Sequence, residues 1–367
     1  MKFLKDFDFD KKRVLVRADL NVPLDEEKWE ISDDFRIKAI VPTLDFLIKK
    51  GAKIVLMSHL GRPEGKIVEN LRMDKVARVF SENLGFKIKK VDNYYSQEIE
   101  EMSLSLNSGE ILLLENLRFW PEEEKNDQDF SQKLSLLGDI YINDAFSASH
   151  REHASITGIA KFFPDKKGIG LLFEKELNSI DNFLREGGGP TVYIIGGIKE
   201  EKVIFLEKIL NKADFILTSG IVARKLSQNL IKNEKIKIPV DVVVSSGDGK
   251  IFVKKFSDID PKTAITDIGP ETQTLYSEYV SKAQKIFWTG SLGKSELQEF
   301  SSGTRAIAES ILKNKKANSI IGGGHLLFVL KQLGLREKGF SHLSTGGGAL
   351  LDYIVDRELP GLSVLED

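Results

Sequence analysis

The sequence of 367 residues contains no cysteine, which excludes disulfide bonds, thiolate nucleophiles and zinc sites with thiolate ligands. It also has no run of about eighteen apolar residues, and its first six residues already carry an acid, so we expect neither a membrane span nor a secretory signal. With 53 basic and 55 acidic residues, the charges nearly cancel, and no overall positive field draws the protein to nucleic acid or to a membrane. We therefore expect a soluble cytoplasmic protein that binds anions only at local sites.

Two common nucleotide-binding signatures are absent as well. No GxxxxGK[ST] string occurs, and no GxGxxG string opens a strand–helix unit. Glycine is nevertheless unevenly distributed, because 21 of the 30 glycines lie after residue 186, in short runs that follow predicted strands. Backbone N–H groups approach phosphate closely at such turns. The distribution predicts a nucleotide site in the second half of the chain.

Short β-branched runs alternate with longer helical patterns along the whole chain, which is typical of parallel sheets with helices on both faces. Together with the length, this rhythm predicts an α/β protein of two Rossmann-like lobes, with one sheet in each half. Helices are expected at Asp34–Lys49, with a kink at Pro42, and at Asp74–Leu84. The predicted strands are Arg13–Val16, Lys53–Met57, Ile111–Leu114, Asp139–Ile142, Thr191–Ile195, Asp214–Leu217, Val240–Val244, Lys285–Trp288 and Ser319–Ile321.

A charged amphipathic helix at Phe173–Arg185 forms the expected joint, because Gly187-Gly188-Gly189-Pro190 follows it and must end the helix. We therefore predict an N-terminal lobe at 1–172, an interdomain helix and hinge at 173–186, and a C-terminal lobe at 187–349. The tail, at about 350–367, is expected to pack back on the first lobe.

Polar and cationic residues follow four successive strands of the first half, where an open parallel sheet binds its ligands. Guanidinium and imidazole groups suit a small, highly charged oxyanion such as a phosphorylated carboxylic acid. Buried salt bridges that tie loops together are the alternative. The four strings are Arg17-Ala18-Asp19-Leu20-Asn21, Ser58-His59-Leu60-Gly61-Arg62, Glu115-Asn116-Leu117-Arg118, and Asn143-Asp144 with His150-Arg151-Glu152-His153 further on.

The last of these strings also allows a metal site, because His150 and His153 stand three residues apart on a possible helix. No third ligand is evident in the sequence, so we favour anion contact there. In the second half, glycine turns occur at Gly196-Gly197, at Gly322-Gly323-Gly324 and at 346–348. Each precedes a predicted helix whose positive end favours phosphate, and Lys199 adds a point charge beside the first turn.

Several long strings resemble the signatures of the phosphoglycerate kinase family: VRADLNVP from Val16, SHLGRP from Ser58, LLENLRF from Leu113, NDAFSASHREHAS from Asn143, and STGGGA from Ser344. The resemblance covers nearly the whole chain. It implies reversible phosphoryl transfer in glycolysis between 1,3-bisphosphoglycerate and ADP, giving 3-phosphoglycerate and ATP. It also implies a cytoplasmic monomer, with acid substrate on the first lobe, nucleotide with magnesium on the second, and closure at a hinge.

The same resemblance implies roles for individual residues. Arg36, Lys199, Gly324 and Gly347 would serve the transferring phosphoryl group. The 3-phosphoglycerate site would consist of Asp19, Asn21, Arg36, His59, Arg62, Arg118 and Arg151. The nucleotide site would consist of Gly196, Gly197, Lys199, Lys202, Gly220, Glu296 at the ribose, Gly322, Gly323, Gly324 and His325.

The chain departs from the family pattern only in the second half. His325 stands where the family usually has an aspartate that helps to hold magnesium, and histidine is a poor ligand for this hard ion. Thr289 and Ser291 replace an asparagine and a proline, and Ile221 and Val222 break a GGGMA stretch. Lys202 lies three residues after Lys199 rather than four, which turns its side chain by about 100° on a helix.

Three functions are compatible with these features. The first is a working kinase in which magnesium is bound chiefly through the nucleotide phosphates. The second is a non-catalytic or regulatory homologue that binds 3-phosphoglycerate but uses nucleotide poorly, with a kinase of altered metal or phosphoryl donor between the two. A nicotinamide-dependent dehydrogenase suits the α/β pattern alone, because its glycine fingerprint is missing. We favour the working kinase.

Overall fold

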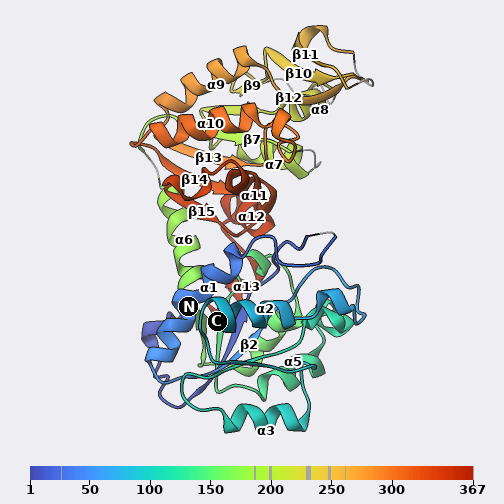
Figure 1. Ribbon diagram of the computed structural model, residues 1–367. Helices are drawn as coiled ribbons and strands as arrows, with labels where there is room; N and C mark the ends of the chain where they lie inside the picture. Colours follow the sequence, from blue (N-terminus) through green and yellow to red (C-terminus); the bar gives the residue numbers. More distant parts are fainter. Residues whose placement is uncertain are drawn as a thin grey trace. The chain divides into compact units, whose positions relative to one another are not determined.

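The chain forms two compact units, Met1–Asn178 with Asp356–Asp367 and Ser179–Val355. The computed structural model describes residues 1–25, 27–185, 187–197, 201–228, 233–246, 249–260 and 262–366, and the side chains of 201–203 and 228 are likewise not described. The chain passes from the first unit to the second within helix α6 (Leu171–Leu184) and returns after Val355 (Figure 1).

The first unit, coloured blue to green in Figure 1, is built around a parallel sheet in the order β3-β4-β2-β1-β5-β6. Val14 to Ala18 are at most 1 % exposed, so the central strand is covered on both faces, as in other parallel sheets. The strands are β1 (Arg13–Ala18), β2 (Lys53–Met57), β3 (Ile88–Lys90), β4 (Ile111–Leu113), β5 (Ile140–Asp144) and β6 (Lys167–Ile169).

The helices of this unit begin at residues that suit a helix start. Ser96 and Asp127 each accept a hydrogen bond from the backbone N–H three positions on and so cap α3 and α5. Apolar residues of α1, such as Ile37, Ile40 and Leu44, pack with β1 and β2 in one core. Pro42 lies inside α1, and α2 continues as a π-helical turn at Val79–Asn83. The helices are α1 (Phe35–Lys49), α2 (Asp74–Arg78), α3 (Gln97–Ser105), α4 (Pro121–Glu124), α5 (Gln128–Ser135) and α13 (Pro360–Ser363).

The second unit contains a parallel sheet in the order β15-β14-β13-β7-β8-β9. Its strands are β7 (Thr191–Ile195), β8 (Phe215–Thr218), β9 (Ile236–Lys237), β13 (Lys285–Thr289), β14 (Asn318–Gly322) and β15 (His342–Ser344). Its helices are α7 (Glu201–Ile209), α8 (Gly220–Gln228), α9 (Pro270–Lys282), α10 (Ser302–Lys313), α11 (Gly324–Gln332) and α12 (Gly348–Asp356). The α/β class and the two parallel sheets confirm the predicted fold.

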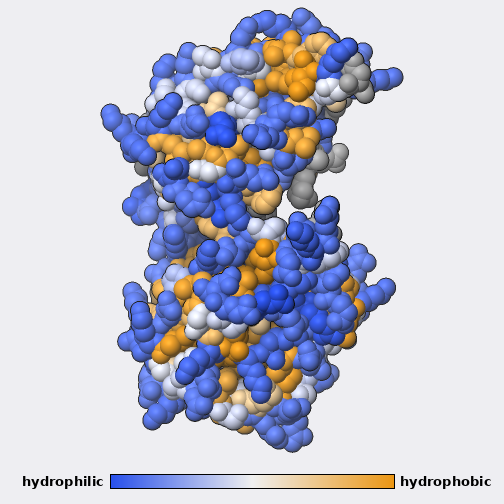
Figure 2. Space-filling view, in the orientation of Figure 1, coloured by the Kyte–Doolittle hydropathy of each residue, from blue (hydrophilic) through white to orange (hydrophobic). Residues whose placement is uncertain are grey.

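The prediction of one sheet per half is wrong for the second half. The strand expected at Val240–Val244 exists as β10 (Asp241–Ser245), but it belongs to a separate antiparallel sheet with β11 (Ile251–Lys255) and β12 (Ala264–Ile268). Strands β10 and β11 form a hairpin, and a connection this short permits only antiparallel pairing. Ile251, Phe252 and Val253 are exposed, and apolar side chains gather over this hairpin in Figure 2.

Candidate functional site

Strand register aligns the cationic strings of the first unit. Arg17 pairs with Met57 of β2 and with Asn143 of β5, so the residues after these strands lie at one edge of the sheet. Asp19 and His59 follow directly and are nearly buried, at 7 % and 4 % exposure. Arg36 approaches the same edge from the first turn of α1 and forms an ion pair with Asp19.

Asp19 organises this edge. Its carboxylate accepts hydrogen bonds from the Ser147 hydroxyl and from the Asn21 backbone N–H, the latter at 3.0 Å. Burial alone would raise the pKa of Asp19, but Arg36 and these hydrogen bonds hold it well below the usual range. Asp19 is therefore an anion at neutral pH. The side-chain carbonyl of Asn21 accepts from the Gly61 N–H at 2.8 Å and so links the first two strand ends.

The remaining predicted cations differ in their partners. Arg118 is 3 % exposed, donates to the Gly61 carbonyl at 3.0 Å and lies 3.2 Å from Glu124. Within the described residues, neither Arg62 nor Arg151 forms an ion pair with a carboxylate. Burial lowers the pKa of Arg151, and the positive charge of Arg62 adds to this shift. The edge therefore holds guanidinium groups that repel one another and that an anion would stabilise.

The possible common helix of His150 and His153 is not found. They do not lie on a common helix, because the 3-10 turn at Phe146–Ala148 ends before them and the next helical turn begins at Ala154. His150 accepts a hydrogen bond from Arg151 Nε at 3.2 Å, whereas His153 points to the buried carboxylate of Glu123, at 3.8 Å. Their different partners remove the basis for a shared metal site.

Sequence reasoning gave no role to three buried residues of this edge, namely Arg17, Ser147 and Glu123. Arg17 directly follows the first predicted strand, Arg13–Val16, but nothing in the sequence shows that its side chain is buried, at 1 % exposure. Ser147 and Glu123 reach Asp19 and Arg17 from segments more than a hundred residues away in the chain. The sequence carries no local signal for such contacts.

In the second unit, register places the glycine turns along one edge of the sheet. Thr289 pairs with Ile195 on one side and with Gly322 on the other, and Gly322 pairs with Ser344. The turns that follow these four strands are therefore neighbours. This edge meets the start of α11 at Gly324 and the start of α12 at Gly348. Four glycine-containing strand ends are thus neighbours, and the first two turns are joined because Gly196 and Gly197 donate to the Thr289 and Ser291 carbonyls at 2.8 and 2.9 Å.

The individual glycines of this edge differ in what they require. A side chain on Gly196 would meet the backbone oxygen of Ser291 at 2.1 Å, so glycine there lets two turns touch. Gly323 and Gly347 have φ of 106° and 53°, which L-residues rarely adopt. A side chain on Gly324 would meet no atom within 4 Å, so the space beside the start of α11 is open. Gly220 begins α8, where a side chain would meet Ile265 at 2.7 Å.

His325 and Glu296 lie beside each other, with His325 Nε2 3.3 Å from Glu296 Oε2 and both side chains about half exposed at 53 % and 50 %. Across the residues that the structure describes, no group of three or more His, Cys, Asp or Glu side chains is placed to hold a metal ion. The pair therefore supplies no metal site by itself. Lys199 lies outside the described residues, and Lys202 is placed on α7 without a described side chain.

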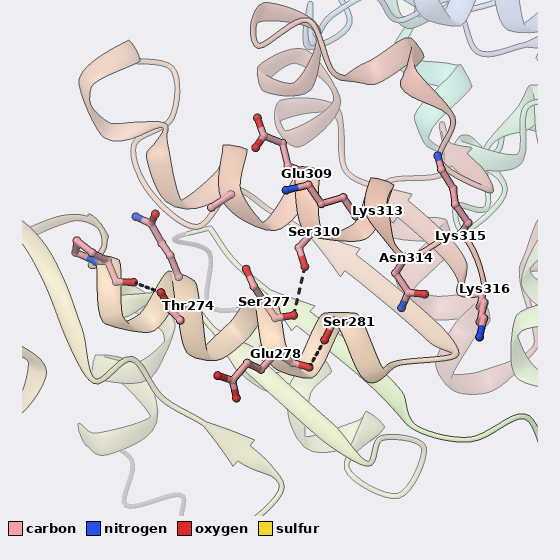
Figure 3. Close-up of a pocket in the computed structure, with 13 residues that line it drawn as sticks. Thr274, Ser277, Glu278, Ser281, Glu309, Ser310, Lys313, Asn314, Lys315 and Lys316 are labelled. Atoms are coloured by element: carbon pink, nitrogen blue, oxygen red, sulfur yellow. Dashed lines mark hydrogen bonds between the residues drawn. The ribbon is translucent and has the colours of Figure 1, made fainter.

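The large groove of the second unit is separate from the glycine edge. It has a volume of about 990 Å³ and lies between α9 and α10 (Figure 3). Its hydroxyls are satisfied by the backbone, since Ser310 donates to the Ser277 carbonyl at 3.3 Å and Ser281 to the Glu278 carbonyl at 2.9 Å. None of the predicted site residues lines it.

Two α/β units, one with a cationic sheet edge and one with a glycine-rich edge, are typical of an enzyme that transfers a phosphoryl group between two small anionic ligands. Comparison with known proteins specifies which one. The family model described as phosphoglycerate kinase matches residues 4–230 and 222–357. The chain belongs to the phosphoglycerate kinase family.

Curated relatives and solved structures agree with this family. The chain is 38 % identical to the phosphoglycerate kinase of Dictyoglomus turgidum (99 % of this chain, 98 % of the relative) and 40 % identical to that of Herpetosiphon aurantiacus (99 % and 98 %). The phosphoglycerate kinase structure from Pyrococcus horikoshii OT3 matches with a TM-score of 0.88 and 32 % identity, over 100 % of this chain and 98 % of that one. The phosphoglycerate kinase structure from Coxiella burnetii matches with a TM-score of 0.79 and 30 % identity, over the same shares of the two chains.

The activity follows from the family. The protein is a phosphotransferase that catalyses reversible phosphoryl transfer between 1,3-bisphosphoglycerate and ADP, a step of glycolysis. Its ligands are small molecules, namely phosphoglycerate and the adenine nucleotides, and enzymes of this family generally use nucleotide with magnesium. No helix among the described residues is long and apolar enough to cross a membrane.

Proposed function

We propose that the sheet edge of the first unit binds 3-phosphoglycerate through the predicted residues Asp19, Asn21, Arg36, His59, Arg62, Arg118 and Arg151. The observation that carries this proposal is the pair Arg62 and Arg151, which have no carboxylate partner in the described structure and repel each other. A dianionic phosphate or a carboxylate removes this repulsion and fits the planar guanidinium fork. Asp19 and Asn21 bind the hydroxyl of the same ligand.

The glycine edge of the second unit binds the nucleotide in this proposal. Backbone donors of the turn 322–324 face phosphate oxygens. Gly196 and Gly197, whose own N–H groups are donated to the Thr289 and Ser291 carbonyls, let the adjacent turn lie close to the phosphates. Gly220 allows the close approach of α8, and Glu296 contacts the ribose. Lys199 and Lys202 contribute positive charge. His325 and Glu296 do not form a cage for magnesium, so we propose that the ion enters with the nucleotide phosphates.

In the direction that consumes ATP, a carboxylate oxygen of 3-phosphoglycerate attacks the γ-phosphorus of ATP. The bond from this phosphorus to the β,γ-bridging oxygen breaks, ADP leaves with the electron pair, and an acyl phosphate forms. Charge spreads over the three equatorial oxygens during transfer, and fixed cations and N–H groups stabilise it. We assign this work to Arg36, Lys199, Gly324 and Gly347. Because both ligands must be in line, closure of the two units is part of the proposal.

Substitution of Arg36 tests this assignment. Arg36→Ala is expected to lower kcat by about a hundredfold or more, because the cation acts mainly on the transition state. The dissociation constant of 3-phosphoglycerate, measured by calorimetry, should change less than tenfold. Arg78→Ala removes an exposed arginine outside the site and serves as the matched control. Equal losses in kcat and in affinity would contradict the transition-state role of Arg36.

A further inference from the structure

A buried charged network lies behind the cationic edge of the first unit, and of its members only His59 belongs to the proposed substrate site. The network consists of Arg17, His59, Glu123, His153 and Ser155, none of which is more than 9 % exposed. Arg17 and Glu123 are 1 % and 0 % exposed. Buried charges are costly unless each one is paired and hydrogen-bonded, so this network requires a physical explanation.

Every nitrogen of the Arg17 guanidinium is engaged. Its Nε donates to Ser155 Oγ at 2.8 Å, Nη1 donates to the Ala18 carbonyl, and Nη2 lies 3.2 Å from His59 Nδ1. Contacts on all three nitrogens fix the plane of the guanidinium. The position of Nη2 at the imidazole is therefore set by the protein and not by a ligand.

The contact between Arg17 and His59 determines the proton on the imidazole. A guanidinium only donates hydrogen bonds, so His59 Nδ1 must be the acceptor and must carry a lone pair. Burial lowers the pKa of His59 and outweighs the opposing charge of Asp19, and the cations Arg17, Arg36 and Arg151 lower this pKa further, which keeps the ring neutral. The single proton is then on Nε2. His59 Nε2 makes no hydrogen bond within the described residues, so this N–H remains available.

Glu123 is the carboxyl nearest to Arg17 in this network; burial raises the pKa of Glu123, and the charge of Arg17 and the hydrogen bonds from Ser155 oppose this rise. Its two oxygens accept from the Ser155 backbone N–H at 2.9 Å and from the Ser155 hydroxyl at 2.6 Å. The nearer oxygen lies 3.9 Å from Arg17 Nη2. Ser155 Oγ thus accepts from Arg17 and donates to Glu123, which connects both buried charges through one hydroxyl. Loss of either charge would leave the other buried without a partner.

We propose that Arg17 and Glu123 are positioning residues that hold His59 as a neutral Nε2–H donor toward an oxyanion of the acid substrate. This inference rests on the proposed function of the edge as the 3-phosphoglycerate site. Arg17 and Glu123 act through His59 and do not contact the ligand. A neutral donor suits an edge already crowded with cations, because it adds a hydrogen bond without adding positive charge.

A double-mutant cycle with a spectroscopic readout tests the inference. In protein with ¹⁵N-labelled histidine, His59 is expected to stay neutral with only Nε2 protonated from pH 5 to 8. In Arg17→Gln, the Nδ1 resonance should shift, and the ring should titrate at higher pH because a neighbouring cation is gone. Calorimetry should show about tenfold weaker 3-phosphoglycerate binding for Arg17→Gln and for His59→Gln, and no further loss in the double variant.

Glu123→Gln keeps nearly the same side-chain shape and should reproduce the shift of the His59 Nδ1 resonance. The same substitution at the neighbouring residue, Glu122→Gln, should leave that resonance unchanged. If Arg17→Gln fails to fold, Ser155→Ala removes the Nε acceptor and keeps both charges, and it should give the same shift in smaller size. Additive losses in the double variant, or a His59 proton on Nδ1, would overturn the inference. If His59→Gln leaves affinity unchanged while the spectral results hold, the proposed substrate site fails instead.

Discussion

His325 and Glu296 are neighbours in the proposed nucleotide site. The resemblance to the family implies an aspartate at the position of His325, and Glu296 is the residue that we propose for the ribose. In this chain His325 Nε2 lies 3.3 Å from Glu296 Oε2, and the two form an ion pair when the imidazole is protonated. A half-exposed ion pair of this kind contributes only about 0–1 kcal/mol to stability. Nucleotide binding can therefore displace it at small cost.

The variant His325→Asp tests whether this position is a weakened metal contact. Two neighbouring carboxylates repel each other, and a hard cation relieves this repulsion. We expect His325→Asp to lower the magnesium concentration needed for half-maximal turnover several-fold. Activity is measured against magnesium at fixed ATP, with His325→Asn as the uncharged control. The same magnesium dependence in all three proteins would show that position 325 no longer serves the metal.

At the same scale, the sequence predicted which residues gather but not what holds them. Strand ends in a parallel sheet meet at one edge, and this rule was enough to bring Asp19 and His59 together. The partners that fix their protonation are Ser147 and Arg17, and such contacts depend on side-chain direction and burial. No local pattern encodes these properties.

At the scale of elements, the glycine turns are of two kinds. Gly196 and Gly290 allow one turn to touch the next, since a side chain on Gly290 would meet the Gly196 oxygen at 2.3 Å. Gly324 faces open space at the first residue of α11. The first kind serves the fold, and we propose that the second serves a ligand. In the sequence, both kinds of turn give the same glycine-rich pattern.

Alanine substitutions separate these two kinds. Gly196→Ala forces backbone apart and should lower the free energy of unfolding by about 1–3 kcal/mol, whereas Gly324→Ala should change it by less than about 1 kcal/mol. Gly324→Ala should nevertheless weaken nucleotide binding at least tenfold, because the methyl group obstructs phosphate. Urea unfolding and nucleotide calorimetry on both variants give the comparison. Unimpaired nucleotide binding by Gly324→Ala would remove this turn from the site.

The same scale shows where pattern reasoning fails. Strand β10 was predicted correctly as a strand, yet its partners could not be deduced, because a β-branched run is equally compatible with parallel and antiparallel pairing. The short connection from β10 to β11 makes their pairing antiparallel, and this connection carries no helical pattern. The periodicity of the sequence therefore predicted the strands of the two large sheets more reliably than those of the small sheet.

At the scale of the whole molecule, buried histidines make stability depend on pH. Burial lowers the pKa of His153 from 6.5 to about 4 and that of His59 to about 3. Between these values and 6.5 the unfolded chain binds protons that the folded protein does not, so stability falls as the pH falls through this range. His153→Gln should lose less unfolding free energy than the parent between pH 7 and 4.5, as measured by urea unfolding. Other buried groups contribute equally to both proteins, and parallel curves would contradict the low pKa of His153.

The central claim is that both sheet edges work together in one active kinase despite the departures around His325. A coupled assay with 3-phosphoglycerate and MgATP tests it most directly, with calorimetric titration of each ligand on its own. We predict turnover that requires both substrates, and heat of binding from each. Tight binding of 3-phosphoglycerate without turnover, and without heat from the nucleotide, would contradict the claim and favour a protein that only binds the acid.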